Sequence, residues 1–237
     1  MEPIATLIEN VNWQKVAANM HQKGYALVPG MLSAEQCQTM IDQYDHPNAY
    51  RKTVNMERYR FGRGEYKYFK YPLPQMVQVL RERIYPKLAP MANQWMQALK
   101  IHTHFPETLR ELTDQCHNKD QVKPTPLILK YGKGGFNTLH QDLYGEVYFP
   151  LQTVFFLNEP DLDYSGGEFV MTQQSPRAQS KAIVLRPKKG DMLIFTTSFR
   201  PVEGTKGYYR ANMKHGVSEI LGGERHTLGI IFHDATS

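Results

Sequence analysis

The chain has 237 residues, of which 41% are hydrophobic and 22% are charged, and its formal net charge is +5. These values are ordinary for a globular protein, and the modest positive charge permits a nucleic-acid or acidic partner without requiring one. No apolar run approaches the roughly 20 residues of a membrane helix, the first residues do not resemble a secretory signal, and Cys37 and Cys116 indicate neither a disulfide framework nor a metal-binding spacing. We therefore expect a cytoplasmic protein without membrane contact, and the composition leaves its oligomeric state open.

The first predicted elements are two capped helices with a strand between them. Asn12 caps a helix whose apolar residues recur at helical spacing and which ends near Gly24. Residues 25–28 then form a short strand. Ser33 and Gln36 have the spacing of a capping box, which predicts that a second helix begins there.

Residues 50–71 alternate between basic and aromatic side chains, and the step Gly62-Arg63-Gly64 predicts a hairpin turn within them. One interpretation is that the hairpin contacts phosphates and stacks on bases, or holds an acidic substrate. The other is that its rings pack inward while its cations face solvent. The side chains concerned are Arg58, Tyr59, Arg60, Phe61, Arg63, Tyr66, Lys67, Tyr68, Lys70 and Tyr71.

The segment 73–100 has a helical pattern that we expect to break near Pro86, with a further helix beginning at Pro90. The segment 101–124 is polar and irregular, which predicts a surface loop. The alternative for this loop is a metal cluster formed by His102, His104, Cys116 and His117.

After Pro126 the pattern changes to eight short β-runs divided by turns that contain glycine and proline. Eight such strands predict a jelly roll, in which two sheets close over a central pocket. The fold class is therefore α+β, with a helical region and its basic hairpin at 1–124 packed on a jelly-roll core at 125–237. The predicted strands cover residues 127–131, 139–142, 151–158, 168–172, 182–185, 191–196, 208–217 and 225–233.

A metal site is indicated by His140 and Asp142, which are two residues apart and share one face of a strand. Two histidines and one carboxylate that leave other positions open form the facial triad of non-haem Fe(II) oxygenases. For the second histidine we choose His215 over His226 and His233, because a distal strand can bring it beside the first pair. His226 points to the opposite face from Arg225.

These motifs together resemble the Fe(II)- and 2-oxoglutarate-dependent oxygenases, on their prolyl-hydroxylase-like branch. The resemblance covers about residues 125–234 and implies a double-stranded β-helix, the cupin-like form of the jelly roll. Over the whole chain the sequence is also similar to a bacterial group of such oxygenases labelled as acting on damaged DNA. The matching residues are Tyr131 and Gly134, His140 and Asp142, Ser165 to Glu168, Lys189 to Asp191 with Phe195, His215 with Val217, and Arg225.

The resemblance implies a role for each site residue. His140, Asp142 and His215 would bind Fe(II), and 2-oxoglutarate would chelate the metal. Its far carboxylate would pair with Arg225 and accept hydrogen bonds from Thr227 and Tyr131, since a guanidinium matches a carboxylate in a bidentate pair. O₂ would be the oxidant, with ascorbate as a candidate reductant, and succinate and CO₂ would leave as a carbon–hydrogen bond is hydroxylated.

The substrate is predicted less directly. We favour an amino acid, a peptide or another small metabolite; the alternative is oxidative demethylation of an alkylated DNA or RNA base. Alkylation-repair dioxygenases carry a second arginine six residues after the cosubstrate arginine, where this chain has Ile231. A flipped base would need an aromatic clamp, for which Tyr66, Tyr144 and Tyr148 are candidates.

Two further hypotheses concern the C-terminal half. Residues 198–210 precede His215 and contain Gly204 and Gly207, so they form either a mobile lid over the pocket or an ordinary loop. A non-catalytic jelly-roll binding protein is a remote alternative to an enzyme. A protein that only binds metal has no use for a carboxylate site at Arg225 and Thr227, which argues against it.

Overall fold

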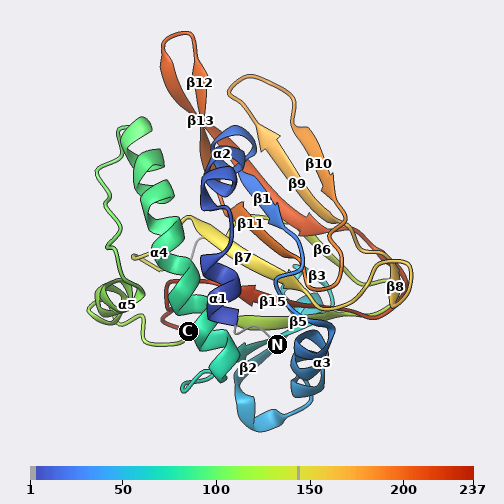
Figure 1. Cartoon of the computed structure of the whole chain (residues 1–237). Coiled ribbons are helices and arrows are strands. Elements are labelled where there is room, and N and C mark those ends of the chain that lie inside the picture. The colour runs from blue at the N-terminus through green and yellow to red at the C-terminus, as the bar shows by residue number, and fades with distance from the viewer. Residues whose placement is uncertain (1–3, 143–144) are drawn as a thin grey trace.

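The computed structural model describes residues 4–142 and 145–237, and Figure 1 shows helices gathered on one side of a pair of β-sheets. The helices are α1 (Ile4–Glu9), α2 (Trp13–Lys23), α3 (Ala34–Gln43), α4 (Gln75–Ala98) and α5 (Leu109–His117), with short 3₁₀ turns η1 (Pro47–Ala49) and η2 (Met56–Tyr59). The N-terminal strands are β1 (Tyr25–Val28), β2 (Tyr50–Asn55), β3 (Gly62–Arg63) and β4 (Glu65–Phe69). The later strands are β5 (Leu127–Tyr131), β6 (Phe136–His140), β7 (Leu151–Phe156), β8 (Tyr164–Gly166), β9 (Phe169–Gln174), β10 (Lys181–Leu185), β11 (Met192–Thr196), β12 (Phe199–Gly204), β13 (Gly207–Val217), β14 (Ile220–Gly223) and β15 (Arg225–Ile230).

Two antiparallel sheets make up the jelly roll, as the sequence predicts. The larger sheet has the order β1-β11-β7-β15-β5-β4-β2, and the smaller has the order β10-β9-β13-β6-β3 with β12 paired to β13. Strands β1, β2 and β4 from the N-terminal half therefore extend the larger sheet, and β3 extends the smaller one. A short pair, β14 and β8, lies apart from both.

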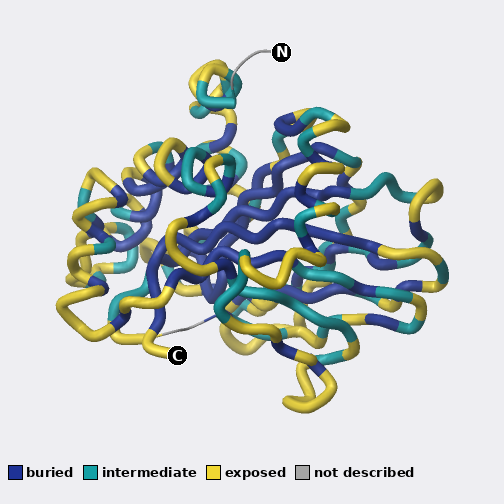
Figure 2. Tube along the Cα trace, turned by 90° about the horizontal axis from the view of Figure 1, so that it is seen from below, coloured by how far each residue is buried: buried dark blue, intermediate teal, exposed yellow. Residues whose placement is uncertain are grey.

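The central strands of the larger sheet are buried on both faces. Residues of β7, β11 and β15 alternate between a core under the helices and the space between the sheets, because successive side chains of a strand point in opposite directions. The helices cover the outer face of this sheet (Figure 1), and buried segments run through the middle of the molecule (Figure 2). The inner face is left free to line a cavity.

The predicted caps are confirmed. Asn12 accepts a hydrogen bond from the backbone of Lys15, and Gly24 ends α2 in the left-handed conformation, with φ of +80°. Ser33 and Gln36 form the expected capping box at the start of α3.

The structure corrects the expected break near Pro86, because α4 runs without interruption through both Pro86 and Pro90. Both prolines are exposed, so the carbonyl groups that lose their helical partners face solvent and can bond to water. The buried face of α4, which includes Tyr85 and Leu88, packs in the core under the larger sheet and holds the helix together.

The segment 101–124 was predicted as a loop and contains α5 instead. Thr108 and Glu111 form a capping box there, and Leu109 and Leu112 are buried. The capping signal is visible in the sequence, but the many polar residues around it obscured the short apolar stripe.

The basic aromatic segment is only partly the predicted hairpin. Strands β2 and β4 do pair, but the reversal between them is not the tight turn expected at Gly62-Arg63-Gly64. Gly62 and Arg63 form β3, which pairs with β6 of the other sheet. Gly62 has φ of +141°, and a side chain there would collide with the carbonyl of Phe136, so only glycine allows this close pairing.

Residues 198–210 form most of a two-stranded projection, β12 and β13, rather than a loop (Figure 1).

Within the described residues, none of the helices combines the length and the apolar content that a membrane span needs.

Candidate metal centre and active-site cavity

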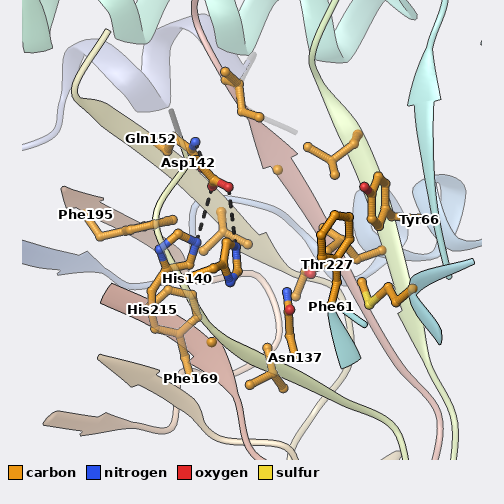
Figure 3. Close-up of a pocket in the computed structure, with 18 of the residues that line it drawn as sticks. Phe61, Tyr66, Asn137, His140, Asp142, Gln152, Phe169, Phe195, His215 and Thr227 are labelled. Atoms are coloured by element: carbon orange, nitrogen blue, oxygen red, sulfur yellow. Dashed lines mark hydrogen bonds and ion pairs between the residues drawn. The ribbon is translucent and has the colours of Figure 1, made fainter. Parts of the chain in front are cut away.

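Three side chains predicted as metal ligands meet at one point between the sheets (Figure 3). His140 ends β6 and His215 lies opposite it in β13, so the two rings are cross-strand neighbours with centroids 4.3 Å apart. Asp142 follows two residues after the end of β6, not within the strand as expected. One ligand atom from each of the three lies within 4.8 Å of the others.

The distances between these atoms fit a shared metal ion. The Nε2 atom of His140 is 3.4 Å from Oδ1 of Asp142, and the Nε2 atom of His215 is 3.3 Å from Oδ2. Ligand atoms placed about 2.1 Å from one metal at right angles would be roughly 3 Å apart. The three residues therefore have the donor set and nearly the spacing that Fe(II) needs.

The ring of His140 is held in the orientation that a ligand requires. Its Nδ1–H donates to the carbonyl of Thr138 at 2.7 Å, which leaves the Nε2 lone pair directed at the site. Burial lowers the pKa of His215, which favours the neutral imidazole that binds metal. Burial alone would raise the pKa of Asp142, but the neighbouring His215 and His140 hold it well below its usual range.

A glycine next to the distal ligand permits the close approach of β13 to β6. A side chain at Gly216 would place its first carbon 2.6 Å from the carbonyl oxygen of Asn137. The pairing of the two strands shifts register between His215 and Val217, as a β-bulge does. The His-Gly-Val sequence therefore matches a bulge that directs His215 into the site.

Gln152 is a site residue that the sequence did not indicate. From β7, its Nε2 donates to Oδ2 of Asp142 at 3.0 Å, and both side chains are buried. A glutamine inside an apolar strand forms no motif. Gln152 shares the inner face of β7 with Val154 and Phe156, and only this position, once the inner face is known, places it toward the metal centre.

A cavity of about 240 Å³ adjoins the three ligands, and its floor is the inner face of the larger sheet. Arg225 and Thr227 line it from β15, and Tyr131 lines it from β5 directly opposite Arg225. All three are buried. The structure thus brings together the six residues that the sequence selected. Further lining residues include Met56, Phe61, Tyr66, Tyr68, Leu127, Leu129, Asn137, Thr138, Phe169, Phe195, Val217, Gly229 and Ile231.

Arg225 is an unusual buried cation. Its side chain is 2% exposed, and within the described residues no carboxylate lies at salt-bridge distance and its Nε has no hydrogen-bond partner. The guanidinium instead sits 5.3 to 5.9 Å from the ring centres of Tyr131, Phe156 and Tyr164. A buried charge is costly unless it is paired, so this end of the cavity suits an anionic group.

Other predicted candidates lie elsewhere. In the described part of the chain, His140, Asp142 and His215 are the only group spaced to hold a metal, so the predicted alternative of a cluster around His102 is wrong; His117 pairs with Asp234 instead. His226 packs against Tyr44 and Asn158 outside the cavity.

Of the clamp candidates, Tyr66 lines the cavity and Tyr148 does not, while Tyr144 lies outside the described residues. Residues 198–210 contribute no described side chain to the cavity wall. The structure therefore gives the lid hypothesis no support.

The jelly roll with its His-x-Asp…His centre defines a 2-oxoglutarate- and Fe(II)-dependent oxygenase, an oxidoreductase with those cofactors. The model of the Oxygenase-NA family, described as an oxygenase catalysing oxidative methylation of damaged DNA, matches residues 64–235. The chain belongs to this family, which places it among enzymes rather than among non-catalytic jelly-roll proteins.

Two curated relatives come from Mycobacterium tuberculosis strains, the uncharacterized proteins MT2286 and Rv2227. Each is 43% identical to the chain over 167 residues, which are 70% of the chain and 72% of the relative.

Solved structures share the fold at low sequence identity. A Pseudomonas putida prolyl-4-hydroxylase is 14% identical with a TM-score of 0.54 and covers 92% of this chain and 97% of its own. A 2OG-Fe(II) oxygenase family oxidoreductase from Burkholderia pseudomallei is 14% identical with a TM-score of 0.55, over 95% and 93%. A Trichoplax adhaerens prolyl hydroxylase is 12% identical with a TM-score of 0.55, over 96% and 89%.

Proposed function

We propose that this oxygenase hydroxylates a carbon–hydrogen bond of an amino acid, a peptide or another small metabolite, with release of succinate and CO₂. The observation that carries the proposal is the buried Arg225, which has no carboxylate at salt-bridge distance among the described residues, at one end of a cavity whose wall contains the three metal ligands. Fe(II) held by His140, Asp142 and His215 supplies the oxidising chemistry when bound.

In this proposal Arg225 binds the far carboxylate of 2-oxoglutarate. Its planar guanidinium can donate two parallel hydrogen bonds, which a lysine could not. The hydroxyl of Thr227 is two residues along the same face of β15 and can donate a further bond. Burial raises the pKa of Tyr131 to about 12, so its hydroxyl stays protonated and can donate to the same carboxylate.

The rest of the cavity would orient the substrate and exclude water. Leu127, Leu129, Phe169 and Phe195 give it a largely apolar wall, which suits a small apolar group next to the metal. An apolar wall also disfavours water next to the reacting carbon, which limits side reactions.

A second candidate function is oxidation of an alkylated base in DNA or RNA. It is favoured by the damaged-DNA description of the family and by a basic aromatic surface next to the cavity, where the Arg51 guanidinium lies 4.6 Å from the ring centre of Tyr68. Against it, the position of the second arginine of alkylation-repair enzymes is Ile231, which is buried in the cavity wall.

Succinate release tests the proposal. Purified protein with Fe(II), 2-oxoglutarate and ascorbate should form succinate, and His140→Ala should abolish the reaction. Added amino acids, peptides or methylated oligonucleotides should raise the rate where they are substrates.

Oligonucleotide affinity measured across salt concentrations separates the two substrate classes, because phosphate contacts release counterions and make binding steeply salt-dependent. Absence of oligonucleotide binding at low salt would eliminate the second candidate. Absence of succinate under all conditions would contradict the proposed function itself.

A further inference from the structure

Three aromatic side chains lie between the metal cavity and a second, outer groove. Phe61, Tyr66 and Tyr68 line both spaces, and we call them the aromatic passage. The outer groove is otherwise lined by Lys52, Val54, Tyr59, Thr125, Gly145 and residues 235–237. A molecule that enters the cavity from this groove must pass these rings.

The passage is fixed to the strands that carry the site. The carbonyl of Phe61 accepts hydrogen bonds from the backbone N–H and the hydroxyl of Thr138, at 2.9 and 2.8 Å. Tyr66 and Tyr68 of β4 lie opposite Leu129 and Leu127 of β5, which form part of the cavity floor. Figure 3 shows the rings of Phe61 and Tyr66 on the far side of the cavity from the three ligands.

Exposure distinguishes Phe61 from an ordinary core residue. Phe61 is 47% exposed and Tyr59 beside it is 56% exposed, and their rings are stacked with centroids 5.5 Å apart. Tyr66 and Tyr68 meet edge to face at 5.4 Å. Rings left exposed around a cavity entrance mark a binding surface more often than a packing one.

The outer end of the passage is basic. Lys52 lines the outer groove. Arg51 is not part of the groove lining, but it stacks on Tyr68, donates to the carbonyl of Pro124 and makes no ion pair among the described residues. Neither cation is neutralised by a carboxylate at salt-bridge distance in the described parts of the chain. This end therefore suits an anionic substituent, while the rings suit a flat apolar body.

We propose that the aromatic passage selects a substrate whose oxidised carbon is attached to a planar aromatic or heteroaromatic ring with an anionic group at its far end. Phe61 and Tyr66 are the specificity-determining residues. The inference rests on the proposed function, which places the reacting carbon at the metal. A nucleotide and a small aromatic acid share this chemistry.

The test uses the full chain loaded with Zn(II) and 2-oxoglutarate, so that probes bind without turnover, and measures binding by ligand-detected NMR. The probes are 4-methylbenzoate, its non-planar counterpart 4-methylcyclohexanecarboxylate, and 1-methyladenosine 5′-phosphate. We expect both planar probes to bind at least about tenfold more tightly than the cyclohexane acid, as ring stacking predicts. The planar probe that binds more tightly shows whether the substrate is a small aromatic acid or a nucleotide.

Phe61→Leu keeps an apolar side chain but removes the ring face, so the preference for planar probes should fall about tenfold. Tyr66→Phe keeps a ring and should retain the preference. The matched control is Tyr208→Leu, which alters a ring that is 52% exposed on β13 and lines neither the cavity nor the outer groove, so the preference should stay nearly unchanged.

The affinity for 2-oxoglutarate, measured in the same samples, distinguishes a failure of this inference from a failure of the proposed function. Wild-type protein that binds 2-oxoglutarate but does not distinguish the planar acid from the cyclohexane acid would overturn the inference alone. An unchanged preference in Phe61→Leu would also overturn it. Wild-type protein that does not bind 2-oxoglutarate would instead contradict the proposed function.

Discussion

Two buried arginines provide a sharp test of the cosubstrate site. Arg81 and Arg225 are each 2% exposed. Arg81 donates to Oδ1 of the buried Asp234 at 2.7 Å and to two backbone carbonyls. Arg225 has no carboxylate at salt-bridge distance within the described chain. The same substitution to methionine should therefore affect folding stability very differently at the two positions.

Arg81→Met leaves the buried carboxylate of Asp234 without its arginine partner, which should cost about 3–5 kcal/mol of unfolding free energy. Arg225→Met removes a charge that has no carboxylate at salt-bridge distance in the described parts of the chain, so the saved desolvation offsets the lost contacts with three rings and the lost hydrogen bond with Tyr164. We expect its stability to stay within about 1 kcal/mol of wild type in the absence of ligand.

Added 2-oxoglutarate should reveal the role of Arg225 that the ligand-free measurement does not show. At 2-oxoglutarate concentrations near 100 times Kd, Zn(II)-loaded wild type should gain about 3 kcal/mol, and Arg225→Met should gain almost nothing. Urea unfolding with and without 2-oxoglutarate measures both quantities. A loss of 3 kcal/mol or more in ligand-free Arg225→Met would show that Arg225 serves the fold, and the reasoning for an anion site would fail.

Three other changes can be tested by direct measurement. Gln152→Leu removes the hydrogen bond to Asp142, so metal affinity measured by titration should fall about 10- to 100-fold while the melting temperature changes little; unchanged affinity would contradict its positioning role. Burial, followed by the charge of Lys130, lowers the pKa of His226 to about 4. The free energy of unfolding should therefore be unaffected by this histidine above about pH 6.5, and it should fall by up to about 3 kcal/mol as the pH drops toward 4. This acid-induced loss should be smaller in His226→Gln, and an identical pH profile would argue against His226 as its source. Gly216→Ala pushes β13 away from the backbone of β6, so it should lower the free energy of unfolding, measured with urea, by about 1–3 kcal/mol and should weaken metal binding. Wild-type values for both quantities would show that the two strands can separate freely.

Much of the jelly roll could be predicted because its strands have strong local signals. Residues 25–28 and 127–131 form strands with the predicted bounds, and the other predicted runs differ mainly at their ends. The pair His140 and Asp142 was recognisable from its spacing, and His215 from its place in a late strand. These signals are local in the chain, so one sequence is enough to find them.

The rest depended on contacts between distant segments. Whether Pro86 breaks a helix depends on which face of that helix meets solvent, and this is settled by packing under the larger sheet. The turn at Gly62 became a strand because β6 lies beside it. Gln152 matters only because β7 runs next to the end of β6. None of these neighbours can be identified from periodicity along the chain.

Thr138 connects two parts of the site that are far apart in the sequence. Its N–H and hydroxyl bond to the carbonyl of Phe61, 77 residues away, and its own carbonyl accepts the Nδ1 proton of His140. A metal ion that fixes the ring of His140 therefore also fixes the backbone that carries the Phe61 ring. Because such coupling is reciprocal, a ligand that packs on the Phe61 ring should also strengthen metal binding at His140, so the affinity for each should rise when the other is bound.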